Sequence, residues 1–257
     1  MADAPVVRVA VPVATRWPDG RTNAYVVGES DALLVDPPAV TPELTDAVEA
    51  RDVAHVAVTH AHRDHVGAVA HYAERCEATV WARAGREHRF GRVARTAPNR
   101  TFREGTAVGP ATVVETPGHA PDHVAFRVGD VALAGDLAVA EGSVFVGGED
   151  GDMRAYLVSL RRLYHADLER LYPGHGGVVE APGTTLERLL AHRRNRERRV
   201  LEAVESGARE LEAVTEAAYA KDLTGVVDMA RLTVAAHLEK LAAEGRIHWD
   251  GERATPV

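Results

Sequence analysis

Four side chains of the kinds that bind metals fall within six positions, and this cluster constrains the fold more than any other feature. They stand in the segment VTHAHRDHVGAV, residues 58–69, and are His60, His62, Asp64 and His65. Zinc takes imidazole nitrogens and carboxylate oxygens as ligands. If the extended geometry of the preceding segment continues, His60 and His62 point the same way. One ion cannot easily use four ligands from so short a loop, so we expect two ions to share them.

Three further residues of ligand type stand in glycine-containing loops later in the chain. They are His119 in TPGHAPDH, Asp136 in AGDLA and His175 in YPGHGG. Each follows an apolar segment, so each is expected at one edge of a sheet, where α/β proteins usually place their sites. Asp136 could bridge two ions with one oxygen each. A single loop histidine is more often merely exposed, and Asp64 alone could cap a helix. The seven residues together predict a dinuclear site.

The apolar patterning predicts that strands and helices alternate around these loops. Strands are predicted at 6–13, 23–28, 32–36, 53–59, 78–82, 111–116, 123–128, 131–136 and within 168–177. Helices in this part of the chain are predicted at 41–50, 65–75 and 153–165. Such alternation is typical of a layered α/β fold with buried sheets.

The composition changes after residue 183, where the chain becomes almost entirely helical. Helices are predicted at 184–206, 208–220 and 227–245, followed by a short strand-like hairpin in 246–257. This order is the pattern of a small winged-helix module. We therefore predict a catalytic domain over 1–182 and a C-terminal helical, winged-helix domain over 183–257.

The motifs resemble those of the metallo-β-lactamase superfamily. THAHRDH, TPGH, AGD and YPGHG occur in that family's order and at similar spacing, and NAYVV, LLVDPP and MRAYLVSLRRL look like further family segments. The resemblance covers about residues 6–180 and implies an αββα sandwich with a dinuclear site on its edge. It also implies the ligand sets: His60, His62 and His119 for the first metal, Asp64, His65 and His175 for the second, and Asp136 as the bridge.

The chemistry implied by the resemblance is hydrolysis by a metal-bridging hydroxide. Two divalent ions are expected, zinc first, although mixed nitrogen and oxygen ligation also suits iron or manganese. Asp64 and Asp136 could also orient the nucleophile. An oxidative role on a single iron is a minor alternative. Cys76 lies outside every motif, so the ligand set differs from that of β-lactamases with a cysteine ligand.

The C-terminal segment bears on the substrate. AHRRNRERRVLEAV and AAHLEKLAAEGRI look like the beta-lactamase-like protein 2 group, which carries a winged helix and includes a single-strand-specific endoribonuclease. The first hypothesis is therefore a phosphodiesterase acting on single-stranded RNA. The alternative is a thioester or ester hydrolase for a small acidic substrate, similar to hydroxyacylglutathione hydrolases. A metal-responsive DNA-binding regulator ranks third, because it leaves a water-activating site idle.

Two arginine clusters are candidates for contact with phosphate. They are Arg83, Arg86, Arg89, Arg92 and Arg95 in one segment, and Arg193, Arg194, Arg196, Arg198 and Arg199 in the other. Solvated faces paired with Glu87, Glu187 and Glu197 are the favoured interpretation, because charge runs are usually that. Gly85 and Gly91 also weaken a helix in the first segment.

The bulk composition narrows the class of protein. A net charge of −8 over 257 residues does not indicate a generally basic nucleic-acid binder. A single cysteine excludes an intrachain disulfide. The sequence has no apolar run long enough for a membrane span and no secretion-signal pattern at its start, so we expect a cytoplasmic protein without a membrane partner. A homo-oligomer stays open.

Overall fold

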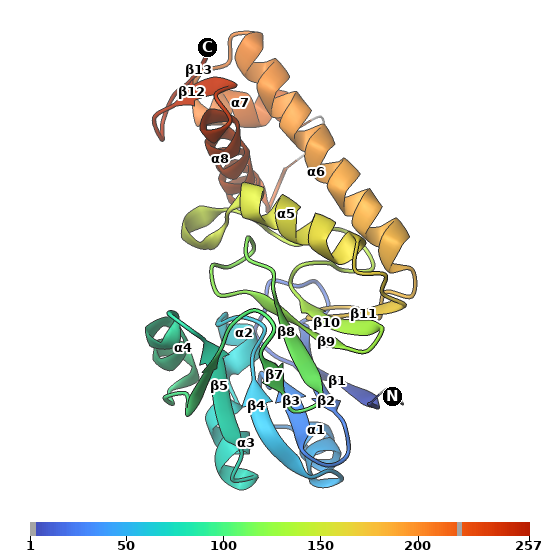
Figure 1. The fold of residues 1–257 in the computed structure, drawn as a ribbon. Coiled ribbons are helices and arrows are strands. Elements are labelled where there is room, and N and C mark those ends of the chain that lie inside the picture. Colours follow the sequence, from blue (N-terminus) through green and yellow to red (C-terminus); the bar gives the residue numbers. More distant parts are fainter. Residues whose placement is uncertain (1–3, 220–222) are drawn as a thin grey trace.

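Two β-sheets face each other, with helices on both outer faces, in a computed structural model that describes residues 4–219 and 223–257 (Figure 1). The first sheet has the order β1-β2-β3-β4-β5-β6, formed by Val6–Pro12, Arg21–Val27, Ala32–Val35, Val53–Ala57, Thr79–Arg83 and Arg100–Phe102. The second has the order β11-β10-β9-β8-β7, formed by Arg170–Pro173, Val131–Gly135, Val124–Val128, Ala111–Glu115 and Ala107–Val108. The predicted α/β sandwich is therefore confirmed.

Alternating side chains of the buried strands fill two separate cores. In β3, Leu33 and Val35 pack between the sheets with residues such as Phe126 of the second sheet. Ala32 and Leu34 point the other way, into a core against the outer helices. This follows from the period of two along a strand, and it explains why these strands read as continuous apolar runs.

Helices cover the outer face of each sheet. Those packed on the first sheet are α1 (Pro42–Glu49), α2 (Arg63–Val66), α3 (Val69–Arg75) and α4 (Glu87–Ala94). The second sheet is covered by α5 (Met153–Tyr164) and by the first half of α6 (Pro182–Glu205), which contributes Leu186 and Leu189 to the core beneath it. A short 3-10 helix, η1 (Gly148–Asp150), precedes α5.

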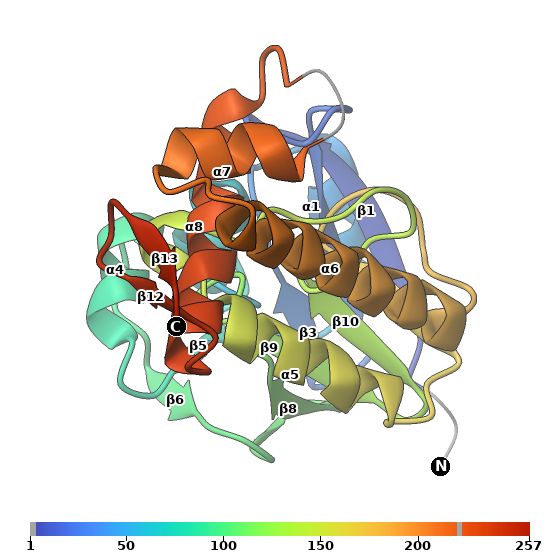
Figure 2. The same ribbon diagram turned by 90° about the horizontal axis from the view of Figure 1, so that it is seen from above.

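The C-terminal part has a core of its own. The second half of α6 packs through Val200 and Val204 against α7 (Leu211–Ala218), α8 (Val227–Ala243), β12 (Ile247–Trp249) and β13 (Ala254–Pro256). Figure 2 shows α6 running from beside α5 to α7 and α8, so one helix serves both cores. The predicted order of three helices and a hairpin is present, although residue 220 of the helix predicted at 208–220 lies outside the described residues. The boundary at residue 182 stays a prediction.

One predicted helix differs from the structure, and several short elements were not predicted. The helix predicted at 65–75 is two helices, α2 and α3, separated around Gly67. At the break, the backbone nitrogen of Ala68 donates to the carbonyl oxygen of Pro37 at 2.9 Å, a tertiary contact that the local sequence does not show. Gly67 permits this approach, because a Cβ atom there would lie 2.2 Å from the carbonyl oxygen of Pro38. Helix α4 and strands β6 and β7 were not predicted. No helix in the described part of the chain is both long and apolar enough to cross a membrane.

Candidate metal centre

The candidate site lies where strands of both sheets end. His60 and His62 follow β4, which is parallel to β3 and β5, so the carboxyl ends of these strands meet at one edge. His119 lies beyond β8, while Asp136 and His175 follow the parallel strands β10 and β11. Gly174 allows the backbone after β11 to lie close to the Asp136 side chain, because a Cβ atom at position 174 would lie 2.4 Å from an Asp136 oxygen.

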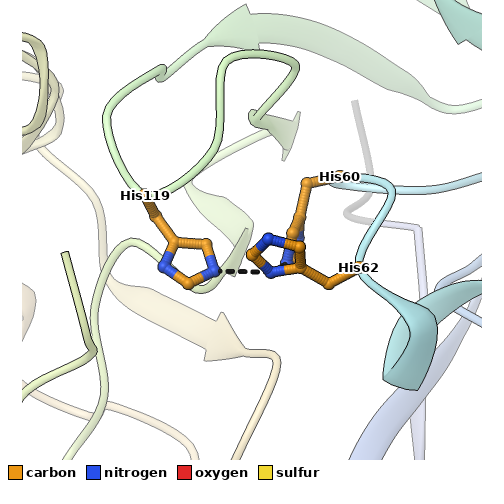
Figure 3. A group of neighbouring side chains, drawn as sticks. All are labelled: His60, His62 and His119. Atoms are coloured by element: carbon orange, nitrogen blue, oxygen red, sulfur yellow. Dashed lines mark hydrogen bonds between the residues drawn. The ribbon is translucent and has the colours of Figure 1, made fainter. Parts of the chain in front are cut away.

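Three histidines from two loops form the first group of ligand atoms (Figure 3). Nδ1 of His62 lies 2.9 Å from Nε2 of His60 and 3.0 Å from Nε2 of His119. His60 is 1% exposed and His119 7% exposed, so these two imidazoles lie below the molecular surface at this edge of the sheets. Three converging nitrogens of this kind match one zinc coordination sphere with a position left open.

The second group consists of Asp64, His65 and His175, whose candidate ligand atoms lie within 4.8 Å of one another. Asp136 lies between the two groups. Its Oδ2 atom is 3.4 Å from Nε2 of His175 and 3.5 Å from Nε2 of His119. The structure thus brings all seven predicted residues together, while their division into two ligand sets and the bridging role of Asp136 stay predictions.

The chemistry of these donors fits divalent cations. Nε2 of His65 and Oδ1 of Asp136 are buried, lie 3.6 Å from each other and have no hydrogen-bond partner among the described residues, so both atoms are available to a cation between them. Burial and the neighbouring imidazoles hold the pKa of His60 well below its usual value, so its ring is neutral. Although burial opposes it, the neighbouring His65 and His175 hold the pKa of the Asp136 carboxyl well below normal, so this group is ionised. Metal binding requires neutral imidazole and ionised carboxylate.

Carbonyl groups fix the tautomer of two ligand histidines. Nδ1 of His119 lies 2.8 Å from the carbonyl oxygen of Phe145, and Nδ1 of His175 lies 2.8 Å from that of Arg21. A carbonyl only accepts, so each Nδ1 carries hydrogen and each Nε2 presents a lone pair to the site. Such partners orient metal ligands and raise their basicity.

Three residues that the sequence analysis did not identify also support the ligands. Oδ2 of Asp36 lies 3.0 Å from Nδ1 of His65, and Oδ2 of Asp150 lies 3.1 Å from Nε2 of His62. His123 accepts a hydrogen bond at Nε2 from the backbone nitrogen of Asp136, at 3.0 Å. Burial lowers the pKa of His123 to about 3, which keeps that nitrogen an acceptor. His123 stands in the quoted TPGHAPDH motif, which was the available signal.

Several arginines of the two clusters have structural roles. Arg193 is 3% exposed and donates to the carbonyl oxygen of Val144, and Arg196 is 9% exposed with its guanidinium 3.4 Å from the Tyr219 ring centroid. Arg89 pairs with Asp122 and Asp150. A solvated face was therefore the wrong interpretation for Arg193 and Arg196, because both side chains are buried.

This sandwich, with a histidine and aspartate cluster on its edge, defines a class of metallohydrolase. Residues 17–175 match the sequence model of the Metallo-beta-lactamase superfamily, and the chain belongs to that superfamily. It is a hydrolase of this class, and its relatives include thioesterases.

The comparisons extend over most of the chain. A Beta-lactamase-like protein 2 homolog from Drosophila melanogaster is 29% identical over 252 residues, with 88% of this chain and 84% of that protein covered. An atrochrysone carboxyl ACP thioesterase from Aspergillus fumigatus is 29% identical, with 76% of this chain and 64% of that protein covered. A solved beta-lactamase domain protein from Burkholderia ambifaria has a TM-score of 0.80 and 20% identity, covers 98% of this chain and 91% of its own, and shows a shared fold.

Proposed function

We propose that the chain is a dinuclear metal-dependent hydrolase. One ion would be held by His60, His62 and His119, the other by Asp64, His65 and His175, and Asp136 would contact both. The observation that carries this proposal is the convergence of these seven side chains, with buried atoms of His65 and Asp136 that face each other but have no hydrogen-bond partner in the part of the chain that the structure describes.

The two ions would supply an acidified water molecule and positive charge for a developing oxyanion. The chain itself holds each ligand in the required state and direction. Asp136, 7% exposed, is enclosed between the two groups. The Asp64 side chain is 20% exposed, so it is the more open carboxylate and the better placed to orient a nucleophile near an entering substrate. Zinc is the first candidate, and iron is supported by a solved structure in a di-iron-bound form that is 29% identical.

An acyl thioester is the substrate class that we favour. The arginines that could have bound phosphate are partly committed elsewhere, because Arg193 and Arg196 are buried and Arg89 is held by two aspartates. The fungal thioesterases among the relatives support the same class, although the chain spans only 64% and 53% of the two that are named so. Trp17 stacks on His175, with ring centroids 5.3 Å apart, and offers an apolar wall beside the second group.

Single-stranded RNA is the second candidate. It is supported by the similarity to Beta-lactamase-like protein 2 over nearly the whole chain and by exposed arginines Arg194, Arg198 and Arg199 on α6. The three helices and hairpin also suit a winged helix. A DNA-binding role for that module has less support, because Arg231 pairs with Glu212, and Lys240 pairs with Glu197 and Glu244. Cytoplasmic location and self-association stay predictions.

One preparation can test both the metal chemistry and the substrate. Metal analysis should give close to two ions per chain, and His62→Ala and Asp136→Ala should each abolish hydrolysis. His71→Ala, which changes an exposed histidine on α3, is the matched control and should remain active. Full activity without metal would overturn the proposal. Acyl thioesters and labelled single-stranded RNA are then offered side by side, and RNA cleavage lost in Asp136→Ala, with inert thioesters, would reverse the order of the two substrates.

A further inference from the structure

The segment over residues 144–150, called loop 144–150 here although it ends in the short helix η1, contacts two histidines of the first group on their sides away from the site. The carbonyl oxygen of Phe145 accepts a hydrogen bond from Nδ1 of His119 at 2.8 Å. At the other end of the loop, Oδ2 of Asp150 accepts one from Nε2 of His62 at 3.1 Å. His62 therefore presents Nδ1 to the site and His119 presents Nε2, which are the nitrogens that meet in Figure 3.

Asp150 is itself held by an arginine that joins several parts of the site. Nη1 of Arg89, on α4, donates to Oδ1 of Asp150 at 2.7 Å, and its Nε atom donates to Asp122 at 3.0 Å. The second oxygen of Asp122 accepts from the backbone nitrogen of Ala61, between the first two histidines, at 2.8 Å. Charge-assisted pairs of this kind fix geometry as well as contribute energy.

The C-terminal helices hold the same loop from its other side. Arg193 of α6 donates to the carbonyl oxygen of Val144 and lies over the Tyr156 ring, with 5.3 Å between guanidinium and ring centroid. Gly147 packs directly on the backbone of α8, where an added Cβ atom would lie 2.6 Å from the carbonyl oxygen of Leu232. The ribbon shows α8 reaching down to the sandwich beside α5 (Figure 1).

We propose that loop 144–150 is a positioning element for the first metal ion, and that α6 and α8 set the affinity for that ion by holding the loop. The C-terminal module would then act on the metal site, independently of any nucleic acid. This inference rests on the proposed dinuclear centre. It assigns Asp150 as a positioning residue that acts through His62 and does not itself contact the ion.

The first test removes the carboxylate at the end of the loop. Zinc is titrated into metal-free full-length chain in competition with a chromophoric chelator, and cobalt absorption reports the ligand geometry. Asp150→Ala should lower the affinity for one of the two ions by about 10–100-fold, the usual effect of removing the hydrogen-bond partner of a metal ligand. The affinity for the other ion should stay unchanged. The matched control is Glu115→Ala, because Glu115 is 27% exposed in an ion pair with Arg83, and Asp150 is 30% exposed in its pair with Arg89.

The identity of the weakened ion follows from a second background. His175→Ala removes a ligand of the second group, so this variant should retain one ion, held by the first group. Adding Asp150→Ala should then lower the affinity for that ion. Equal weakening of both ions, or wild-type binding of both by Asp150→Ala, would overturn the proposal. If the wild-type chain binds fewer than two ions, the dinuclear function fails instead, so the two failures are distinguishable.

The second test addresses the helices. Gly147→Ala introduces a clash that forces loop 144–150 and α8 apart. Arg193→Met keeps an apolar side chain against Tyr156 and removes the donor to Val144, so this variant tests the loop contact without a clash. Each should weaken the same ion as Asp150→Ala does, with the second ion unchanged. Gly183→Ala is the control, because nothing lies within 4 Å of a Cβ atom there. Normal binding of the first ion by a folded Arg193→Met protein would overturn the role of the C-terminal helices.

Discussion

The Asp36 carboxylate lies beneath the metal centre, 1% exposed, and accepts three hydrogen bonds. Its donors are the backbone nitrogen of Thr59 at 2.6 Å, the Thr59 hydroxyl at 2.7 Å and Nδ1 of His65 at 3.0 Å. Asp36→Asn leaves a buried donor unpaired, so we expect the free energy of unfolding to fall by about 1.5–3 kcal/mol. Urea denaturation measures this. Asp31→Asn is the control, because Asp31 has a similar positive φ of 50° against 53° but an exposed side chain. An equal loss in both variants would contradict the role assigned to Asp36.

At this scale, the ligands could be predicted, whereas the residues that support them had a signal only where a quoted motif contained them, as TPGHAPDH contains His123 and LLVDPP contains Asp36. Four of the ligands can be recognised because they lie close together in one short segment: His60, His62, Asp64 and His65. The remaining ligands can be recognised because they stand in loops after predicted strands. Asp150 carries no such signal, because its partner His62 lies 88 positions away and only the folded chain brings them together. Burial of Arg193 is equally invisible, since an arginine on a polar helix is ordinarily solvated.

The connection from β8 to His119 meets helix α5 at Gly118. A Cβ atom at this position would lie 2.2 Å from the backbone nitrogen of Tyr156, and its φ of +134° also disfavours a side chain. We expect Gly118→Ala to lower the free energy of unfolding by about 3 kcal/mol, as overpacking against backbone adds to conformational strain. Gly105→Ala, with φ of +75° and open space around it, isolates the strain and should cost about 1–2 kcal/mol. Equal losses measured by urea denaturation would contradict the clash.

Tertiary contacts also decided which elements could be predicted. Strands that are buried on both faces can be predicted from continuous apolar runs. The strands found where predicted include β3, β4, β9 and β10. The break between α2 and α3 coincides with a hydrogen bond from the backbone nitrogen of Ala68 to the distant Pro37 carbonyl, which no local pattern carries. Helix α4 forms despite Gly91, because Phe90 and Ala94 pack into the core of the first sheet. Packing against a core routinely overrides intrinsic helix propensity.

The long helix α6 links the sandwich to the C-terminal core, and buried His237 of α8 lies against it. Nδ1 of His237 is 3.5 Å from Glu197 of α6, and neither ring nitrogen has a hydrogen-bond partner in residues 4–219 and 223–257. Burial first, and then Arg193 and Arg196, outweigh Glu197 and hold the pKa of His237 below its usual value of 6.5. The unfolded chain therefore binds this proton more readily, so stability falls as pH drops below about 6.5.

This linkage predicts how much of the pH dependence of the whole molecule comes from His237. The groups around His237 that carry or gain charge are Glu197, Lys240, Arg193, Arg196 and His192. Glu197 has a lowered pKa, so its contribution is present above the unfolded-state value near 4.5 and is lost only below it. Between pH 7.5 and 5.5, the melting temperature of wild type should therefore decline more steeply than that of His237→Leu. His71→Leu, at an exposed histidine, should follow the wild-type profile. Parallel profiles for wild type and His237→Leu would show that His237 does not couple protonation to folding.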